Sequence, residues 1–224
     1  MKVVYPLGNG SNWDDKELKY SINSLFKFTN VTEIYIVGSI PRCELHEDVF
    51  ILPFESNYKH SAQRVAHNLI CFLDKVNPNE FIVMNDDFFC NQNCNLNDLP
   101  LWYDKKTSER LQKPGISSKY KYTLLKSIRD KEDLNFGVHF PLPVRHVDVF
   151  RESLKEAIQV TNGCSYRNIY GNKVKEMENI QQRNDLKFSK HTKTPEDVLK
   201  YDWFSIGDEF LLPHCKRFII EQYS

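Results

Sequence analysis

Short apolar runs alternate with amphipathic segments along the first 90 residues. Four runs are bounded by glycine, proline or asparagine, which predicts short buried strands; they lie at 3–7, 33–38, 49–52 and 81–84. Between them, apolar residues recur every three or four positions at 18–26 and 62–73, which predicts two amphipathic helices. This alternation predicts an α/β fold with a mixed, mostly parallel sheet flanked by helices.

The pattern is less regular after residue 90. Residues 91–135 are polar and without clear periodicity, which is typical of a mobile lid or an acceptor loop. The elements expected farther on are an extended piece at 136–141, a helix at 147–158, a helix start at Thr194-Pro195, an extended piece at 204–208 and a last helix ending near Tyr223. We therefore predict one domain, in which an insert at 91–135 separates a half at 1–90 from a half at 136–224.

One apolar run ends in an unusual way. Residues 81–84 lead directly into Asn85-Asp86-Asp87, and two phenylalanines follow. Buried carboxylates are costly unless they are paired or bound to metal. The carboxyl edge of an α/β sheet is where ligands normally bind, and Mg²⁺ prefers carboxylate oxygens together with substrate phosphates. The stretch therefore predicts a metal–diphosphate site with Asp87, and with Asp86 as a second candidate. A turn or a helix N-cap is the alternative, because all three residue types favour those positions.

Two further features bear on a ligand site at this edge. Gly8-Asn9-Gly10 follows the first apolar run, and glycines there let the backbone approach a ligand closely, although the spaced fingerprint of dinucleotide sites is absent. Asp14 or Asp15 is expected to cap the helix that follows.

Composition narrows the class of protein. Lysine plus arginine and aspartate plus glutamate both number 30, so the net charge is zero, which disfavours non-specific binding of duplex DNA but allows a local basic patch. No apolar run approaches the length of a membrane span, and the apolar stretch at the N-terminus is too short for a secretory signal. We interpret the six cysteines as reduced thiols of a cytoplasmic protein; Cys90 and Cys94, the only close pair, are the alternative metal ligands.

Several blocks of the chain resemble the Stealth family of sugar-phosphate transferases. They run from Asp15 to Leu25, from Ile34 to Val37, over Ile40-Pro41 and over Asn85-Asp86-Asp87-x-Phe89. Weaker likenesses follow at His139-x-Pro141-x-Pro143, at Arg167 and at Gly207-Asp208. The resemblance implies a catalytic core similar to the GT-A glycosyltransferase fold, with 1–90 as the nucleotide-binding half and 136–224 as the acceptor side.

The resemblance also implies roles for individual residues. Asp87 would be the metal or phosphate-site residue, His139 an acid/base or phosphate-contacting group, and Arg167 a phosphate clamp. Asp208 is a second candidate for the acceptor base. Because GT-A enzymes often add a late histidine as a metal ligand, His214 is a further candidate. Gly8, Asn9, Asn85 and Asp86 complete the expected donor site.

The chain departs from the family at one position. The family has a glutamate on the helix before the Asn-Asp-Asp run, whereas this chain has Ser61-Ala62-Gln63-Arg64. Arg64 suits a donor diphosphate, whose charge it would stabilise as the nucleotide leaves; His67 lies on nearly the same helical face and is expected to act with it. We therefore expect a glycosyltransferase dependent on Mg²⁺ or Mn²⁺ that moves a sugar from a nucleotide sugar to a hydroxyl group.

Other functions remain open on the sequence. Transfer of a sugar 1-phosphate, the reaction of the Stealth family, is the first alternative. The acceptor is either a glycan or a hydroxymethylated DNA base, which lysines at 105–106, 119, 121 and 126 would help to bind. A sugar-binding module without catalytic activity is the last alternative.

Overall fold

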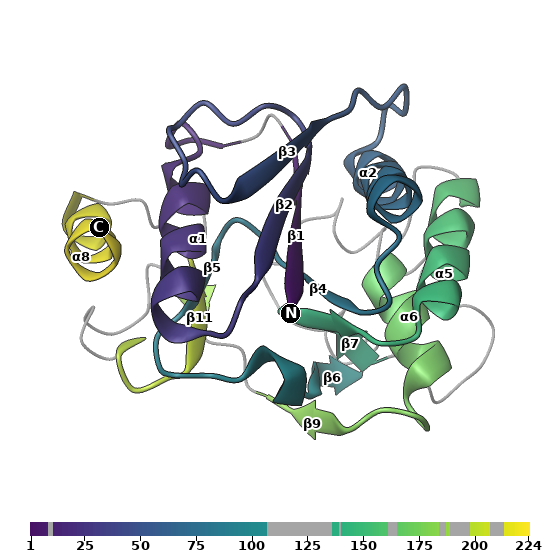
Figure 1. Ribbon diagram of the computed structural model, residues 1–224. Helices are drawn as coiled ribbons and strands as arrows, with labels where there is room; N and C mark the ends of the chain where they lie inside the picture. Colours follow the sequence, from purple (N-terminus) through teal and green to yellow (C-terminus); the bar gives the residue numbers. More distant parts are fainter. Residues whose placement is uncertain are drawn as a thin grey trace.

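The computed structural model describes residues 1–8, 11–106, 136–138, 140–160, 165–183, 187–188, 198–206 and 213–224 (Figure 1). Its centre is a five-stranded sheet in the order β3-β2-β1-β4-β8. The strands are β1 (Lys2–Leu7), β2 (Glu33–Gly38), β3 (Val49–Pro53), β4 (Phe81–Val83) and β8 (Leu142–Val144). The first four are parallel, and β8 pairs with β4 antiparallel. The predicted α/β class with a mixed, mostly parallel sheet is confirmed.

Helices cover both faces of this sheet. They are α1 (Lys16–Phe28), α2 (Ser61–Val76), α5 (Val147–Gln159), α6 (Tyr166–Val174) and α8 (Pro213–Tyr223). Figure 1 shows α1 and α8 on one side and α2, α5 and α6 on the other. In the part of the chain described, no helix is long and apolar enough to cross a membrane.

Two small sheets flank the centre. One has the order β10-β11-β5 and consists of β10 (Lys187–Phe188), β11 (Trp203–Ile206) and β5 (Phe88–Cys90). The other has the order β7-β6-β9 and consists of β7 (Phe136–Val138), β6 (Leu101–Lys106) and β9 (Ile180–Gln182). A 3₁₀ turn, η1 (Leu96–Asp98), precedes β6. Leu101 and Trp102, which lie within the expected insert at 91–135, are buried in a strand that pairs with two others, whereas residues 107–135 lie outside the described part of the chain.

Apolar periodicity explains how α1 packs. Its buried residues include Leu18, Ile22 and Leu25, which recur at helical spacing and join the main apolar cluster of β1, β2 and β4. A second cluster joins α1 and α8 to the β5–β11 pair, where Phe89 stacks on Phe204 with ring centroids 5.0 Å apart. Both clusters reach the segment that connects β4 to β5, so that segment is held from two sides.

The end of β2 requires a glycine. Gly38 has φ +116°, a conformation that side chains rarely adopt. A Cβ there would lie 2.3 Å from Asn68 Nδ2 and 2.4 Å from the Leu7 carbonyl oxygen. The glycine that stops the second apolar run thus lets α2 approach the carboxyl ends of β1 and β2.

Candidate functional site

The carboxyl ends of the parallel strands surround a cavity of about 540 Å³. Strands β1, β2 and β3 contribute its floor, and the first two turns of α2 contribute one wall. The lining residues are Leu7, Gly8, Gly38, Ser39, Ile40, Pro53, Phe54, Glu55, Ser56, Ser61, Arg64, Val65 and Asn68. The location is the one expected for a ligand site in an open α/β sheet, and it includes the predicted residues Gly8 and Arg64.

Part of the cavity wall is rigid and aromatic. Phe54 lines the cavity and packs edge-to-face on His67, with ring centroids 4.9 Å apart. Nδ1 of His67 lies 3.1 Å from Ser56 Oγ, and Tyr58 packs on the other side of the imidazole at 5.2 Å. His67 therefore packs against the segment after β3. The prediction that it acts together with Arg64 stays a prediction.

Arg64 and Asn68 differ in exposure along the same face of α2. Arg64 is exposed, and its Nη1 donates to the Lys59 carbonyl oxygen at 3.2 Å. Asn68 is only 6% exposed; its Nδ2 donates to the Val37 carbonyl oxygen at 3.4 Å, and its Oδ1 accepts no hydrogen bond from the described residues. In the sequence, Asn68 is marked only as a polar side chain within an apolar helical pattern, so it was not predicted as a site residue.

Asn85, Asp86 and Asp87 form the turn between β4 and β5. The Phe88 amide donates to the Asn85 carbonyl oxygen at 3.2 Å, and Asn85 Nδ2 donates to Asp87 Oδ1 at 2.6 Å. The Ile206 amide donates to the Asp87 carbonyl oxygen at 2.9 Å. A turn and a ligand site are therefore compatible here, because the turn places two carboxylates at the carboxyl end of β4, next to β1.

The turn is strongly acidic. Burial is the largest cause, followed by the nearby carboxylates of Asp87, Glu17 and Asp15, and together they raise the pKa of Asp86 to about 7. Glu17 is itself buried, and its Oε2 accepts no hydrogen bond from any described residue. This concentration of negative charge makes the turn attractive to cations.

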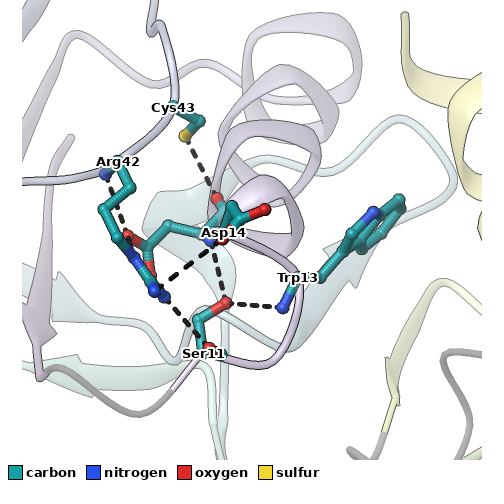
Figure 2. A network of polar contacts seen from close by, with 6 residues as sticks. Ser11, Trp13, Asp14, Arg42 and Cys43 are labelled. Carbon is teal, nitrogen blue, oxygen red and sulfur yellow. Dashed lines mark hydrogen bonds and ion pairs between the residues drawn. The ribbon is translucent and has the colours of Figure 1, made fainter.

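A hydrogen-bond network fixes the loop before α1 (Figure 2). Arg42, which follows β2, donates through its backbone N and its Nε to Asp15 Oδ2 at 2.9 and 3.0 Å, and through Nη2 to the Ser11 carbonyl oxygen at 3.0 Å. Ser11 Oγ accepts from the amides of Trp13 and Asp15 at 3.1 and 2.8 Å. Asp15 does precede α1, but its side chain makes no capping hydrogen bond. Asp15 is thus at the predicted N-cap position, but Arg42 binds the carboxylate that would otherwise have capped the helix.

Arg167 is linked to the end of the Asn-Asp-Asp turn through two aromatic rings. Its guanidinium stacks on the ring of Phe140 at 4.3 Å, and Phe140 packs edge-to-face on Phe88 at 5.9 Å. Arg167 is half-buried, and no carboxylate within the described residues pairs with it. The chain of contacts ends at Phe88, the residue after Asp87, and the role of Arg167 as a phosphate clamp stays a prediction.

Other predicted residues are less well placed. Asn9, His139 and Asp208 lie outside the described residues, as do the lysines at 119, 121 and 126. His214 is exposed at the second position of α8. Among the described residues, no three histidine, cysteine, aspartate or glutamate side chains are grouped to hold a metal ion, so a metal on Asp87 and His214 stays a prediction. The cysteines described, which include Cys90 and Cys94, are free thiols.

Comparison with known proteins identifies no family for this chain. The chain matches no protein-family model, and a search of curated proteins finds no significant match. The likeness to the Stealth family therefore remains a resemblance carried by the residues themselves.

Proposed function

We propose that the protein is a glycosyltransferase that moves a sugar from a nucleotide-sugar donor to a hydroxyl group of an acceptor. The observation that carries the proposal is the cavity at the carboxyl ends of β1, β2 and β3, with Arg64 on its wall and the acidic turn at the end of the adjacent β4. A nucleotide in the cavity would extend its phosphates toward this turn. Arg64 in place of the glutamate of the Stealth family supports transfer of the sugar over transfer of a sugar phosphate.

The residues at the turn suit Mg²⁺ or Mn²⁺ held jointly with the donor. Mg²⁺ is commonly bound by one or two carboxylates together with substrate phosphates, which requires no cluster of three protein ligands. Asp87 is the predicted ligand, and the hydrogen bond from Asn85 Nδ2 orients its carboxylate. The ion would offset the negative charge of the leaving diphosphate.

The arginines would bind the phosphates from two sides. Arg64 is on the cavity wall, and Arg167 is held beside the turn by its stacking on Phe140. In the reaction, the acceptor oxygen forms a bond to the anomeric carbon, the bond from that carbon to the phosphate oxygen breaks, and the nucleoside diphosphate leaves. The acceptor proton passes to a base, for which His139 and Asp208 are the predicted residues.

The test is a panel of nucleotide sugars incubated with the protein and Mn²⁺, with a glycan and a hydroxymethylated DNA as acceptors. Release of nucleoside diphosphate is expected, and Asp87→Asn should abolish it, whereas Asp48→Asn, an exposed carboxylate with 72% of its side chain accessible, should not. Release of nucleoside monophosphate would instead identify transfer of a sugar 1-phosphate, because a P–O bond of the diphosphate linkage would have broken. If no donor turns over and no nucleotide binds, the proposal is wrong.

A further inference from the structure

We infer that Ser56 is a nucleophile activated by His67, and that the cavity hydrolyses small carboxylic esters through an acyl group carried on Ser56. This activity would be independent of the proposed transfer of sugars, because it uses neither the acidic turn nor a metal ion. Ser56 lies in the segment between β3 and α2; it is half-buried and lines the cavity, so a ligand there can reach it.

Ser56 and His67 form a hydrogen-bonded pair of nucleophile and base. Ser56 Oγ lies 3.1 Å from Nδ1 of His67, which is within the reach that proton transfer from a nucleophile to its base requires. The Tyr58 amide donates to the same oxygen at 3.4 Å. Ser56 Oγ thus already accepts a hydrogen bond and can direct its own proton at His67. The tautomer of His67 that carries its proton on Nε2 would receive this proton on Nδ1.

The imidazole of His67 is held in place by packing. Phe54 and Tyr58 pack edge-to-face on it, with ring centroids 4.9 and 5.2 Å away. His67 belongs to the second turn of α2, so the helix and the segment before it fix the pair together. In serine hydrolases a carboxylate orients the base. No carboxylate pairs with His67 in the described part of the chain, where the histidine ion pairs are those of His46 and His146. The two aromatic rings would orient the base instead.

The lack of such a carboxylate bears on the class of substrate. The imidazolium that forms on proton transfer is then less stabilised, so the leaving group must depart easily. An ester releases its alcohol more readily than an amide releases its amine, which favours esters over peptides. The charged residues among the lining are Arg64 and Glu55, one of each sign. A neutral ester therefore suits the cavity better than a phosphate monoester dianion that arrives without a metal ion.

The reaction would proceed in two steps. Ser56 Oγ forms a bond to the carbonyl carbon of the ester, and its proton passes to His67 Nδ1. The bond from that carbon to the alkoxy oxygen then breaks, and the alcohol leaves with the proton. In the second step, water attacks the acyl carbon and gives a proton to Nδ1; the carboxylic acid departs, and Ser56 Oγ takes the proton back.

Positive charge on the cavity wall would stabilise the oxyanion of each step. Arg64 lines the cavity, and its guanidinium is exposed. The first turn of α2 has no acidic residue, and the N-cap residue His60 makes no side-chain hydrogen bond to it, so the positive end of the helix is not offset locally. Fixed positive groups of this kind contribute strongly to acyl transfer.

A fluorophosphonate probe tests the nucleophile directly, because an activated serine forms a P–O bond to its phosphorus and releases fluoride. Intact-mass spectrometry should show a single adduct on the wild type, and peptide mapping should place it on Ser56. Ser56→Ala and His67→Gln should each lower the labelling rate at least about a hundredfold. Ser224→Ala and His46→Gln are the matched controls, because they remove an exposed serine and an exposed histidine that do not line the cavity.

Hydrolysis of p-nitrophenyl acetate tests the acyl intermediate. The wild type should release a burst of p-nitrophenol stoichiometric with the protein, and Ser56→Ala should lack it. Ser56→Ala keeps both aromatic contacts of His67, so it decides the test even if His67→Gln does not fold.

The inference is overturned if the wild type is not labelled, if Ser56→Ala is labelled at the wild-type rate, or if p-nitrophenyl phosphate is hydrolysed in preference to the acetate. A burst that depends on Ser56 in a protein that turns over no nucleotide sugar would support the esterase and count against the proposed function alone.

Discussion

Replacing Asp86 by asparagine should stabilise the protein at neutral and alkaline pH. Raising the pKa of Asp86 from its ordinary value of 3.8 to about 7 corresponds to about 4 kcal/mol against the ionised carboxylate. Asp86 is half-buried, and solvent screening reduces the expected gain to about 2 kcal/mol.

The direction in which stability changes with pH follows from proton binding by Asp86. The unfolded chain has the lower pKa, so between pH 3.8 and about 7 the folded protein retains a proton that the unfolded chain has lost. The free energy of unfolding therefore falls as the pH rises through this window. Above the window, the folded protein bears the full free-energy cost of an ionised Asp86. Asp86→Asn removes the titration, so its advantage over the wild type should be smallest near pH 4 and largest above pH 7.

Thermal unfolding at several pH values, in the presence of EDTA to exclude bound cations, measures this difference. About 2 kcal/mol corresponds to a rise in Tm of roughly 4–8 °C for a chain of this size. Asp48→Asn removes an exposed aspartate and should change Tm little at any pH. A lower Tm for Asp86→Asn at pH 8, or a difference that does not vary with pH, would refute the reasoning.

Four further results are expected. Gly38→Ala should lower the free energy of unfolding by more than about 2 kcal/mol, because the added Cβ would clash with Asn68 Nδ2 and the Leu7 carbonyl oxygen. Urea denaturation measures this loss, and an unchanged midpoint would contradict the packing described. Phe89→Ala, which removes a fully buried ring stacked on the second apolar cluster, should cost about 3–5 kcal/mol in the same assay. Arg167→Lys should raise the KM for the donor about tenfold in the nucleotide-release assay, because lysine loses the planar stacking and the forked donors; a wild-type KM would exclude the clamp. Chelation of divalent cations should weaken binding of nucleoside diphosphates at least about tenfold and leave nucleosides unaffected; equal affinities with and without EDTA would argue against a metal.

The elements that were predictable are those whose pattern is local. Strands β1 to β4 and helices α1, α2 and α5 have apolar runs or helical periodicity long enough to be recognised, and Gly38 stops its strand as expected. Strands β8 and β9 have three residues each, and they exist because of the strands beside them: β8 pairs with β4 and β9 with β6. No sequence window of that length carries such a pairing.

The site was predictable only in part, for a similar reason. Asp86 and Asp87 stand out because two carboxylates interrupt an apolar run. Asn68 and Glu17 do not stand out, because what distinguishes them is burial without a partner, which depends on how α1 and α2 pack on the sheet. The expected cap at Asp15 failed because Arg42, 27 residues away, binds the same carboxylate.

Charge is segregated around the sheet edge although the net charge of the chain is zero. Asp86, Asp87 and Glu17 concentrate negative charge at the end of β4, while Arg64 lines the cavity beside β1 and Arg167 stacks on Phe140. A diphosphate that reaches from the cavity toward the turn would gain from both arginines and would be repelled by the carboxylates. A divalent cation between the turn and the phosphates converts that repulsion into attraction, because its charge is the largest in the site. This arrangement would let the protein distinguish a metal-bound nucleotide from a free one, and it gives a physical reason for keeping an acidic turn that weakens the folded state.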